Sequence, residues 1–120
     1  MRVLITGTRD TGAWVLKVDT ELRRICGIYG RENVTVVHGD CPSGIDKAAQ
    51  VVCEREGITS ERHPADWKRY GKVAGPMRNQ KMVSLGADIV LAFPKGASRG
   101  TRDCIERAVI GGLDVEIFEL

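Results

Sequence analysis

A segment near the amino terminus combines a glycine with side chains that can bind an anion. The apolar run RVLIT is followed directly by Gly7, Thr8, Arg9 and Asp10. A glycine at such a turn lets backbone N–H groups approach a ligand closely, and an arginine can donate two parallel hydrogen bonds to a phosphate or a carboxylate. These residues predict one wall of an anion site, although a plain turn with a solvated Arg9–Asp10 pair would use the same residues.

A second segment, HGDCPSGID at residues 38–46, has two glycines beside an expected helix start. Ser43 is a good N-cap residue, and an anion could rest on the helix amino end formed with Gly39 and Gly44. Asp46 falls in the first helical turn, where it could accept a hydrogen bond from a ribose hydroxyl or simply complement the helix dipole. The sequence leaves both roles open. His38 stands at a strand end and is expected to be structural.

A third segment, the strongest of the three, opens directly onto a helix. It contains Pro94, Lys95, Gly96, Ala97, Ser98, Arg99, Gly100 and Thr101. Backbone amides, the helix dipole and the basic side chains of Lys95 or Arg99 would all favour a phosphate. A mobile surface loop in which Thr101 only caps the helix is the alternative. The phosphate site is favoured because the other two glycine segments should meet at the same edge.

Further candidates surround the sequence GPMRNQKM. Arg78 and Asn79 are expected in the first turn of a helix beginning at Pro76, where positive charge opposes the helix dipole. That local cost indicates a use in binding. Trp67 and Tyr70 precede this helix in a polar loop. They could stack on a base or cover the edge of the sheet, and the covering role is the expected one.

The elements that must position these residues alternate between short β-branched runs and helical stretches. Strands are predicted at 2–6, 34–38, 59–63, 88–93 and 115–118, and helices at 13–29, 43–56, 76–85 and 101–110. The apolar strands are typical of parallel strands buried on both faces, and right-handed crossovers place helices on both sides. We therefore predict a Rossmann-like α/β fold with an open parallel sheet of strand order 3-2-1-4-5.

Composition narrows the function classes. The chain of 120 residues, 42% of them hydrophobic, is expected to form one domain. A net charge of +2 argues against nucleic acid as a partner, and no apolar run approaches the ~20 residues of a membrane span. The start MRVLITG is typical of a strand, which predicts a cytoplasmic protein. Cys26, Cys41, Cys53 and Cys104 form no CxxC pair, so four free thiols are expected, with no metal site and no cofactor.

These segments together resemble the SLOG superfamily of Rossmann-like ligand-binding proteins, and within it the YspA, cpYpsA-related SLOG family. The resemblance extends over nearly the whole chain and rests on four ordered blocks: MRVLITGTRD, VVHGDCPSGID, HPADWKRYGKVAGPMRN and ADIVLAFPKGASRGT. It implies a Rossmann-like fold and a site for a nucleotide or nucleotide-derived ligand. Because SLOG relatives often pair, it also implies a homodimer by analogy.

A more distant similarity is to the Lonely Guy phosphoribohydrolases of the same superfamily, which release a base from a nucleoside monophosphate. Arg78 in RNQKM matches the arginine of their RKxxM-type segment, and Gly100 and Thr101 match the GT of their PGGxGTxxE motif. Cys104 occupies the position of the motif's glutamate. Without that carboxylate, an oxocarbenium-like centre loses its expected partner, so the departure weakens the enzyme interpretation and leaves Arg78 as the one matched catalytic candidate.

Two hypotheses follow. The first is a binding or sensing module for a nucleotide-derived ligand in bacterial or phage signalling. The second is a hydrolase of an N-glycosidic or phosphate–sugar bond, with Asp46, Asp103 or Glu106 in place of the missing acid, or with Cys104 as a nucleophile of lowered pKa near a helix amino end. A third class, a nucleic-acid-associated protein like the superfamily's DprA, is opposed by the near-neutral charge.

Overall fold

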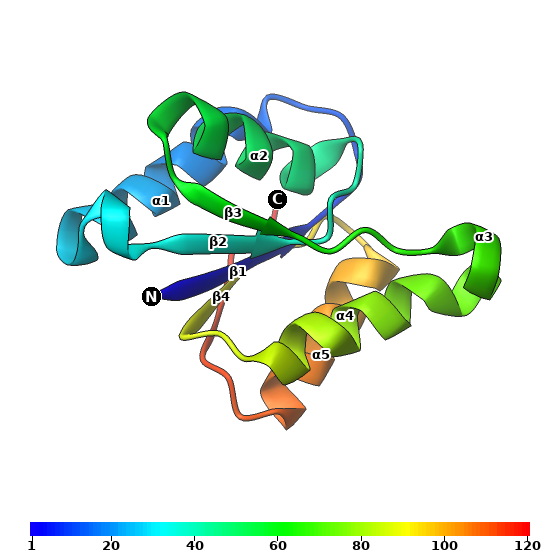
Figure 1. The fold of residues 1–120 in the computed structure, drawn as a ribbon. Helices are drawn as coiled ribbons and strands as arrows, with labels where there is room; N and C mark the ends of the chain where they lie inside the picture. Colours follow the sequence, from blue (N-terminus) through cyan, green and yellow to red (C-terminus); the bar gives the residue numbers. More distant parts are fainter.

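The backbone forms a five-stranded, all-parallel sheet of order β3-β2-β1-β4-β5, as predicted (Figure 1). A computed structural model describes all residues, 1–120. The strands are β1 (Arg2–Gly7), β2 (Thr35–His38), β3 (Thr59–Arg62), β4 (Ile89–Phe93) and β5 (Val115–Ile117). The α-helices are α1 (Trp14–Tyr29), α2 (Gly44–Glu56), α3 (Trp67–Tyr70), α4 (Ala74–Leu85) and α5 (Arg99–Ile110). Single 3₁₀ turns occur at η1 (Arg31–Asn33) and η2 (Gly71–Val73).

Helices cover both faces of the sheet because the central strands are apolar on both sides. Figure 1 shows α1 and α2 on one face and α4 and α5 on the other. Alternate residues of a strand point to opposite faces, so Ile5 of β1 joins the core under α1 and α2 while its neighbour Leu4 joins the core under α4 and α5. The larger core includes Leu22 of α1 and Val52 of α2, and the smaller one includes Met82 of α4.

Residues 64–74, between β3 and α4, were predicted as a polar loop, and this is wrong because part of the segment is helical. It contains the one-turn helix α3, whose amino end is capped by the Asp66 carboxylate accepting from the backbone N–H of Arg69. Two of the predicted helices begin two residues earlier than expected, α4 at Ala74 and α5 at Arg99. Pro76 did not mark the start of α4, because a proline is tolerated throughout the first turn, where no helical N–H bond is lost.

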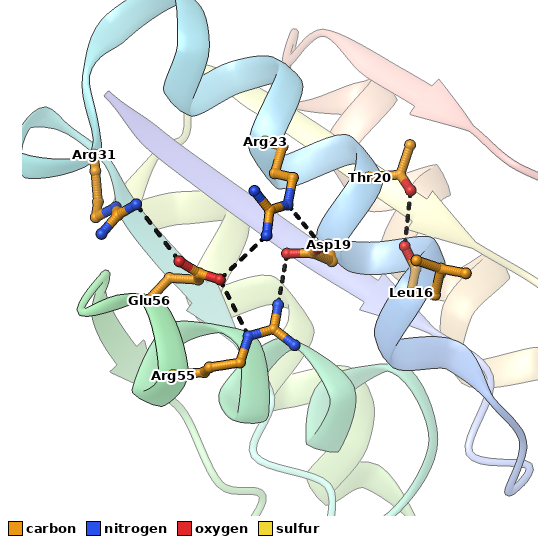
Figure 2. A network of polar contacts seen from close by, with 7 residues as sticks. All are labelled: Leu16, Asp19, Thr20, Arg23, Arg31, Arg55 and Glu56. Atoms are coloured by element: carbon orange, nitrogen blue, oxygen red, sulfur yellow. Dashed lines mark hydrogen bonds and ion pairs between the residues drawn. The ribbon is translucent and has the colours of Figure 1, made fainter.

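A cluster of ion pairs connects α1 to α2, the two helices on one face of the sheet (Figure 2). The Asp19 carboxylate accepts from Arg23 at 2.8 Å and from Arg55 at 2.7 Å, and Glu56 pairs with Arg23 and Arg31. Only Asp19 is buried among them. The network therefore joins the two helices where their apolar contact ends.

No helix of the structure combines the length and the apolar character needed to cross a bilayer.

Candidate functional site

The loop after β1 is held in shape by hydrogen bonds to β4, to the Thr8 side chain and to Trp14. The N–H of Thr8 donates to the carbonyl oxygen of Phe93 on β4 at 3.0 Å, and the Thr8 hydroxyl accepts from the N–H of Asp10 at 3.1 Å. The indole N–H of Trp14 donates to the Asp10 carbonyl at 2.8 Å. Thr8 is buried, so this loop leaves β1 along a fixed path that presents Arg9 and Asp10 at the carboxyl edge of the sheet.

The amino end of α2 is docked onto that loop. The N–H of Ile45 donates to the Thr8 carbonyl at 3.0 Å, and the Ser43 hydroxyl donates to the Arg9 carbonyl at 2.8 Å. Gly44 has φ of 70°, and a Cβ there would collide with the Thr8 carbonyl oxygen. Ser43 occupies the N-cap position of α2 as expected, but its hydroxyl bonds to the neighbouring loop and makes no capping bond to the helix. These bonds occupy groups that an anion on this helix end would need.

The amino end of α5, in contrast, is open. Ser98 adopts a left-handed conformation with φ of 37°, and its hydroxyl donates to the Thr101 hydroxyl at 2.8 Å. The first helical bond runs from the N–H of Arg102 to the Ser98 carbonyl, and the amides of Arg99, Gly100 and Thr101 have no partner within the protein. A Cβ on Gly100 would meet nothing within 4 Å. Thr101 lies inside the helix, so it does not cap it.

Arg78 of α4 ties together the ends of two strands. Its Nη1 donates to the carbonyl oxygens of Gly39 after β2 and of His63 after β3, the latter at 3.3 Å. Its Nε donates to the Asn79 side-chain oxygen at 2.9 Å. Because α4 begins at Ala74, Arg78 lies in the second turn. The argument that its charge opposes the helix dipole is therefore wrong, since that effect fades beyond the first turn.

Asn79 connects α4 to the open end of α5. The side chain is 4% exposed, and its amide nitrogen donates to the Gly100 carbonyl at 3.1 Å and to the Asp103 carboxylate at 3.0 Å. The same carboxylate accepts from Arg107 at 2.9 Å. With its oxygen engaged by Arg78, Asn79 has both ends of its amide occupied. The structure therefore gives Asn79 a positioning role at this site.

Around these groups lies a pocket of about 660 Å³ at the carboxyl edge of the sheet. That volume is within the usual range for small-molecule sites. The lining is largely polar and includes five basic and three acidic side chains. Of the predicted binding residues, thirteen line it: Gly7, Thr8, Arg9, Asp10, Gly39, Asp46, Arg78, Asn79, Lys95, Ser98, Arg99, Gly100 and Thr101. Ligand binding by any of them stays a prediction.

Four predicted binding residues do not line the pocket: Ser43, Gly44, Pro94 and Gly96. Ser43 and Gly44 belong to the docked amino end of α2 described above. Gly7 lines the pocket, but a Cβ there would collide with the Ile45 side chain, so close packing of α2 already requires this glycine. A sequence pattern cannot distinguish a glycine needed for helix packing from one that approaches a ligand.

Several lining residues were not predicted as binding residues, among them Trp67, Lys72, Gly75 and Pro76. These four come from α3, η2 and the start of α4. Trp67 was expected to cover the sheet edge, but its indole packs over Gly75 and lines the pocket. The one sequence signal that could have identified these lining residues was the pair of aromatic residues in an otherwise polar segment. That signal did not show that the segment folds next to the pocket.

The arginines of this chain fall into two groups. Eight of the twelve form ion pairs with carboxylates: Arg2, Arg23, Arg24, Arg31, Arg55, Arg62, Arg102 and Arg107. Four do not, and three of these four, Arg9, Arg78 and Arg99, line the pocket. Lys72 on the rim is also without a carboxylate partner, whereas Lys95 lies 3.5 Å from Asp10. Positive charge is thus in excess in this pocket, where five basic side chains face three acidic ones.

Asp46 is the buried acid of the pocket. It lies in the first turn of α2, is 7% exposed, and accepts from the N–H of Cys41 at 3.3 Å. In the first turn its carboxylate complements the helix dipole, and its contact with a ligand stays a prediction. Asp103 also lines the pocket, but Glu106 is exposed on α5 and does not.

The two thiols near the site are poor nucleophiles. Cys104 is fully buried, and desolvation raises its pKa to about 11. Burial and the nearby Asp46 carboxylate likewise raise the pKa of Cys41. A thiol reacts as its thiolate, so the hypothesis that Cys104 has a lowered pKa is wrong. The error arose because α5 begins at Arg99, which places Cys104 in the second turn, facing the core.

His38 has the structural role expected of it. The ring is buried, its Nδ1 accepts from the N–H of Asp40 at 3.0 Å, and its Nε2 lies 2.8 Å from the Gln50 side-chain oxygen. An accepting Nδ1 places the proton on Nε2, which donates to Gln50. Both ring nitrogens are therefore used inside the protein. No group of three or more His, Cys, Asp or Glu side chains is arranged to hold a metal ion.

The fold and the pocket define a Rossmann-like α/β protein with a polar, cation-rich cavity at the carboxyl ends of its parallel strands. A family model matches residues 1–70, and the chain belongs to the YspA, cpYpsA-related SLOG family. It is 43% identical over 125 residues to the Gene 61 protein of Mycobacterium phage D29, covering 98% of this chain and 95% of the phage protein. No solved structure matches the chain. Family membership indicates a role in binding or modifying a nucleotide-related ligand.

Proposed function

We propose that the pocket binds a nucleotide or nucleotide-derived ligand through its phosphate, and that the protein acts as a sensing or signalling module. The observation that carries this proposal is the distribution of arginines. Of the four without a carboxylate partner, Arg9, Arg78 and Arg99 all line one cavity. Unpaired cations gathered in a cleft attract an anion and raise its local concentration.

The phosphate is assigned to the amino end of α5. The unpartnered amides of Arg99, Gly100 and Thr101 carry the positive end of the helix dipole. A Cβ on Gly100 would meet nothing within 4 Å, so there is open space next to these amides, and Arg99 and Lys95 line the same pocket. A phosphate there would receive several charge-assisted hydrogen bonds at once. Asp46 is then the acceptor for a sugar hydroxyl deeper in the pocket.

The test is calorimetry of the purified protein with AMP, NAD and ADP-ribose. Replacing Arg99 with alanine should weaken binding about 10-fold or more, because a hydrogen bond to a charged group contributes about 1.5–3 kcal/mol. Arg69→Ala is the matched control, since Arg69 also lacks a carboxylate partner but lies outside the pocket over Tyr70. Binding of none of these ligands at millimolar concentration, or equal binding by both variants, would refute the proposal.

A second variant places negative charge directly in the assigned phosphate site. Gly100→Asp should fold normally, because the Cβ position is empty and φ there is ordinary. Its carboxylate would occupy the region in front of the α5 amides and repel a phosphate. We expect this variant to keep the wild-type unfolding temperature without ligand and to lose the ligand-induced increase. A full increase in the variant would contradict the assignment.

One observation favours a second function, hydrolysis of an N-glycosidic bond. Asp46 is a nearly buried carboxylate in the same pocket as Arg78, the residue that matches the arginine of the phosphoribohydrolases. Asp46 could then stabilise a cationic sugar centre in place of the glutamate whose position Cys104 occupies. Chromatography of nucleoside monophosphates incubated with the protein decides this. Release of free base that is lost in Asp46→Asn supports the hydrolase, and no release removes it.

A further inference from the structure

The polar pocket contains a single aromatic side chain, Trp67, the first residue of α3. Its indole is 45% exposed. The ring lies against the start of α4, where a Cβ on Gly75 would come within 2.9 Å of it. The absence of a side chain at Gly75 therefore lets a large flat ring lie close to the α4 backbone. Figure 1 shows α3 projecting beyond the carboxyl ends of the strands.

Arg9, from the loop after β1, completes this wall. Its guanidinium carbon lies 5.0 Å from the centre of a Trp67 ring, the geometry of a cation–π pair. The Arg9 side chain makes no hydrogen bond or ion pair, so its planar group and donors remain available. Aromatic rings such as an indole and the planar group of an arginine are surfaces on which proteins stack nucleobases.

We infer that Trp67 and Arg9 form the base-binding wall of the pocket, and that the ligand is a nucleotide that keeps its aromatic base. This inference rests on the proposed function, because it adds a base subsite to the phosphate site at α5. The two subsites come from different elements and differ in chemistry: Trp67 and Arg9 offer π surface, whereas α5 offers amides and charge. A nucleotide has the same division between its base and its phosphate.

The decisive comparison uses two kinds of probe. The first is the set of nucleoside 5′-monophosphates AMP, GMP, CMP and UMP, and the second is ribose 5-phosphate, which lacks a base. Stacking of one base is worth about 1–3 kcal/mol, so Trp67→Leu should weaken the best-bound monophosphate about 10-fold. The same variant should change ribose 5-phosphate binding less than about 2-fold. Tyr70→Leu is the matched control, because Tyr70 is an exposed aromatic residue on the same short helix that does not line the pocket.

A fluorescence measurement covers the case in which Trp67→Leu does not fold. The chain has two tryptophans, and Trp14→Phe leaves Trp67 as the only one. The monophosphates should quench its emission on binding, and ribose 5-phosphate should not.

The outcomes separate the two proposals. Wild-type protein that binds neither kind of probe overturns the base wall, and it overturns the phosphate site as well if NAD and ADP-ribose also fail to bind. Wild-type protein that binds ribose 5-phosphate as tightly as every monophosphate overturns the base wall alone. A folded Trp67→Leu variant that loses both kinds of probe equally, or binds both like Tyr70→Leu, also overturns the base wall. Selective loss of the monophosphates supports it.

Discussion

Replacing Gly44 with alanine should destabilise the protein far more than replacing Gly57, at the other end of α2. Both glycines have a left-handed backbone, with φ of 70° and 67°, so each alanine carries a conformational cost of about 1–2 kcal/mol. At Gly57 the new methyl group would have nothing within 4 Å. At Gly44 it would lie 2.7 Å from the Cα of Arg9 and nearer still to the Thr8 carbonyl oxygen. Relief of that collision requires α2 to move away from the loop after β1.

Such a movement breaks the hydrogen bond from the N–H of Ile45 to the Thr8 carbonyl, which costs about 1–3 kcal/mol more when buried groups are left unpaired. We expect the free energy of unfolding to fall by about 2–5 kcal/mol in Gly44→Ala and by about 1–2 kcal/mol in Gly57→Ala. Urea denaturation followed by tryptophan fluorescence measures both, with m-values compared to verify that the transitions are alike. Equal losses in the two variants would show that φ alone, and not docking of α2, demands the glycine.

Three further predictions concern charge and reactivity. The Arg2 guanidinium holds the pKa of Glu61 at about 2, below its usual 4.5, so ionised Glu61 stabilises the fold above pH 4.5 and this contribution is lost as the pH falls through 2. In thermal melts, Glu61→Gln should lower the free energy of unfolding by about 1 kcal/mol at neutral pH and by much less at pH 2, where about half of the Glu61 carboxyl groups are protonated. Iodoacetamide should label Cys104 in urea but not in the native protein, and rapid native labelling seen by peptide mass spectrometry would contradict its burial. Asp19→Asn should lower the free energy of unfolding by about 1 kcal/mol in low salt. In molar salt the loss should be smaller, because screening weakens the ion pair between Asp19 and Arg55. A loss that does not depend on salt would exclude an ionic origin.

The predicted strand order and the family were both confirmed. The patterns that predict the strands and helices are local. Within β1, and again within β4, the apolar residues that become buried are consecutive in the chain, and a glycine lies within two residues of the end of each α-helix. Once the alternation of strands and helices is known, right-handed crossovers leave few arrangements of the sheet. The convergence of the glycine segments at one edge followed from this order, and most of the predicted binding residues do line one pocket there.

The boundaries of α4 and α5 illustrate where local patterns fail. Proline and threonine are both common at helix starts, so Pro76 and Thr101 marked positions at which each helix had already begun. A start two residues earlier moves every later residue two positions further from the helix amino end, beyond the first turn of about 3.6 residues. For this reason the sequence placed Arg78 in the first turn of α4 and treated Cys104 as a group near the helix amino end.

By itself, the sequence determined the element order, the parallel sheet, and the edge at which the polar segments meet. Tertiary structure alone decided which charges are neutralised and which remain free. Arg2 finds its carboxylate at Glu61, 59 residues away, and Arg78 finds its acceptor at Gly39, 39 residues away. It alone also brought Trp67 beneath Arg9. The strand pattern depends on neighbours along the chain, whereas the partner of an arginine or an indole depends on distant segments that only folding brings within reach.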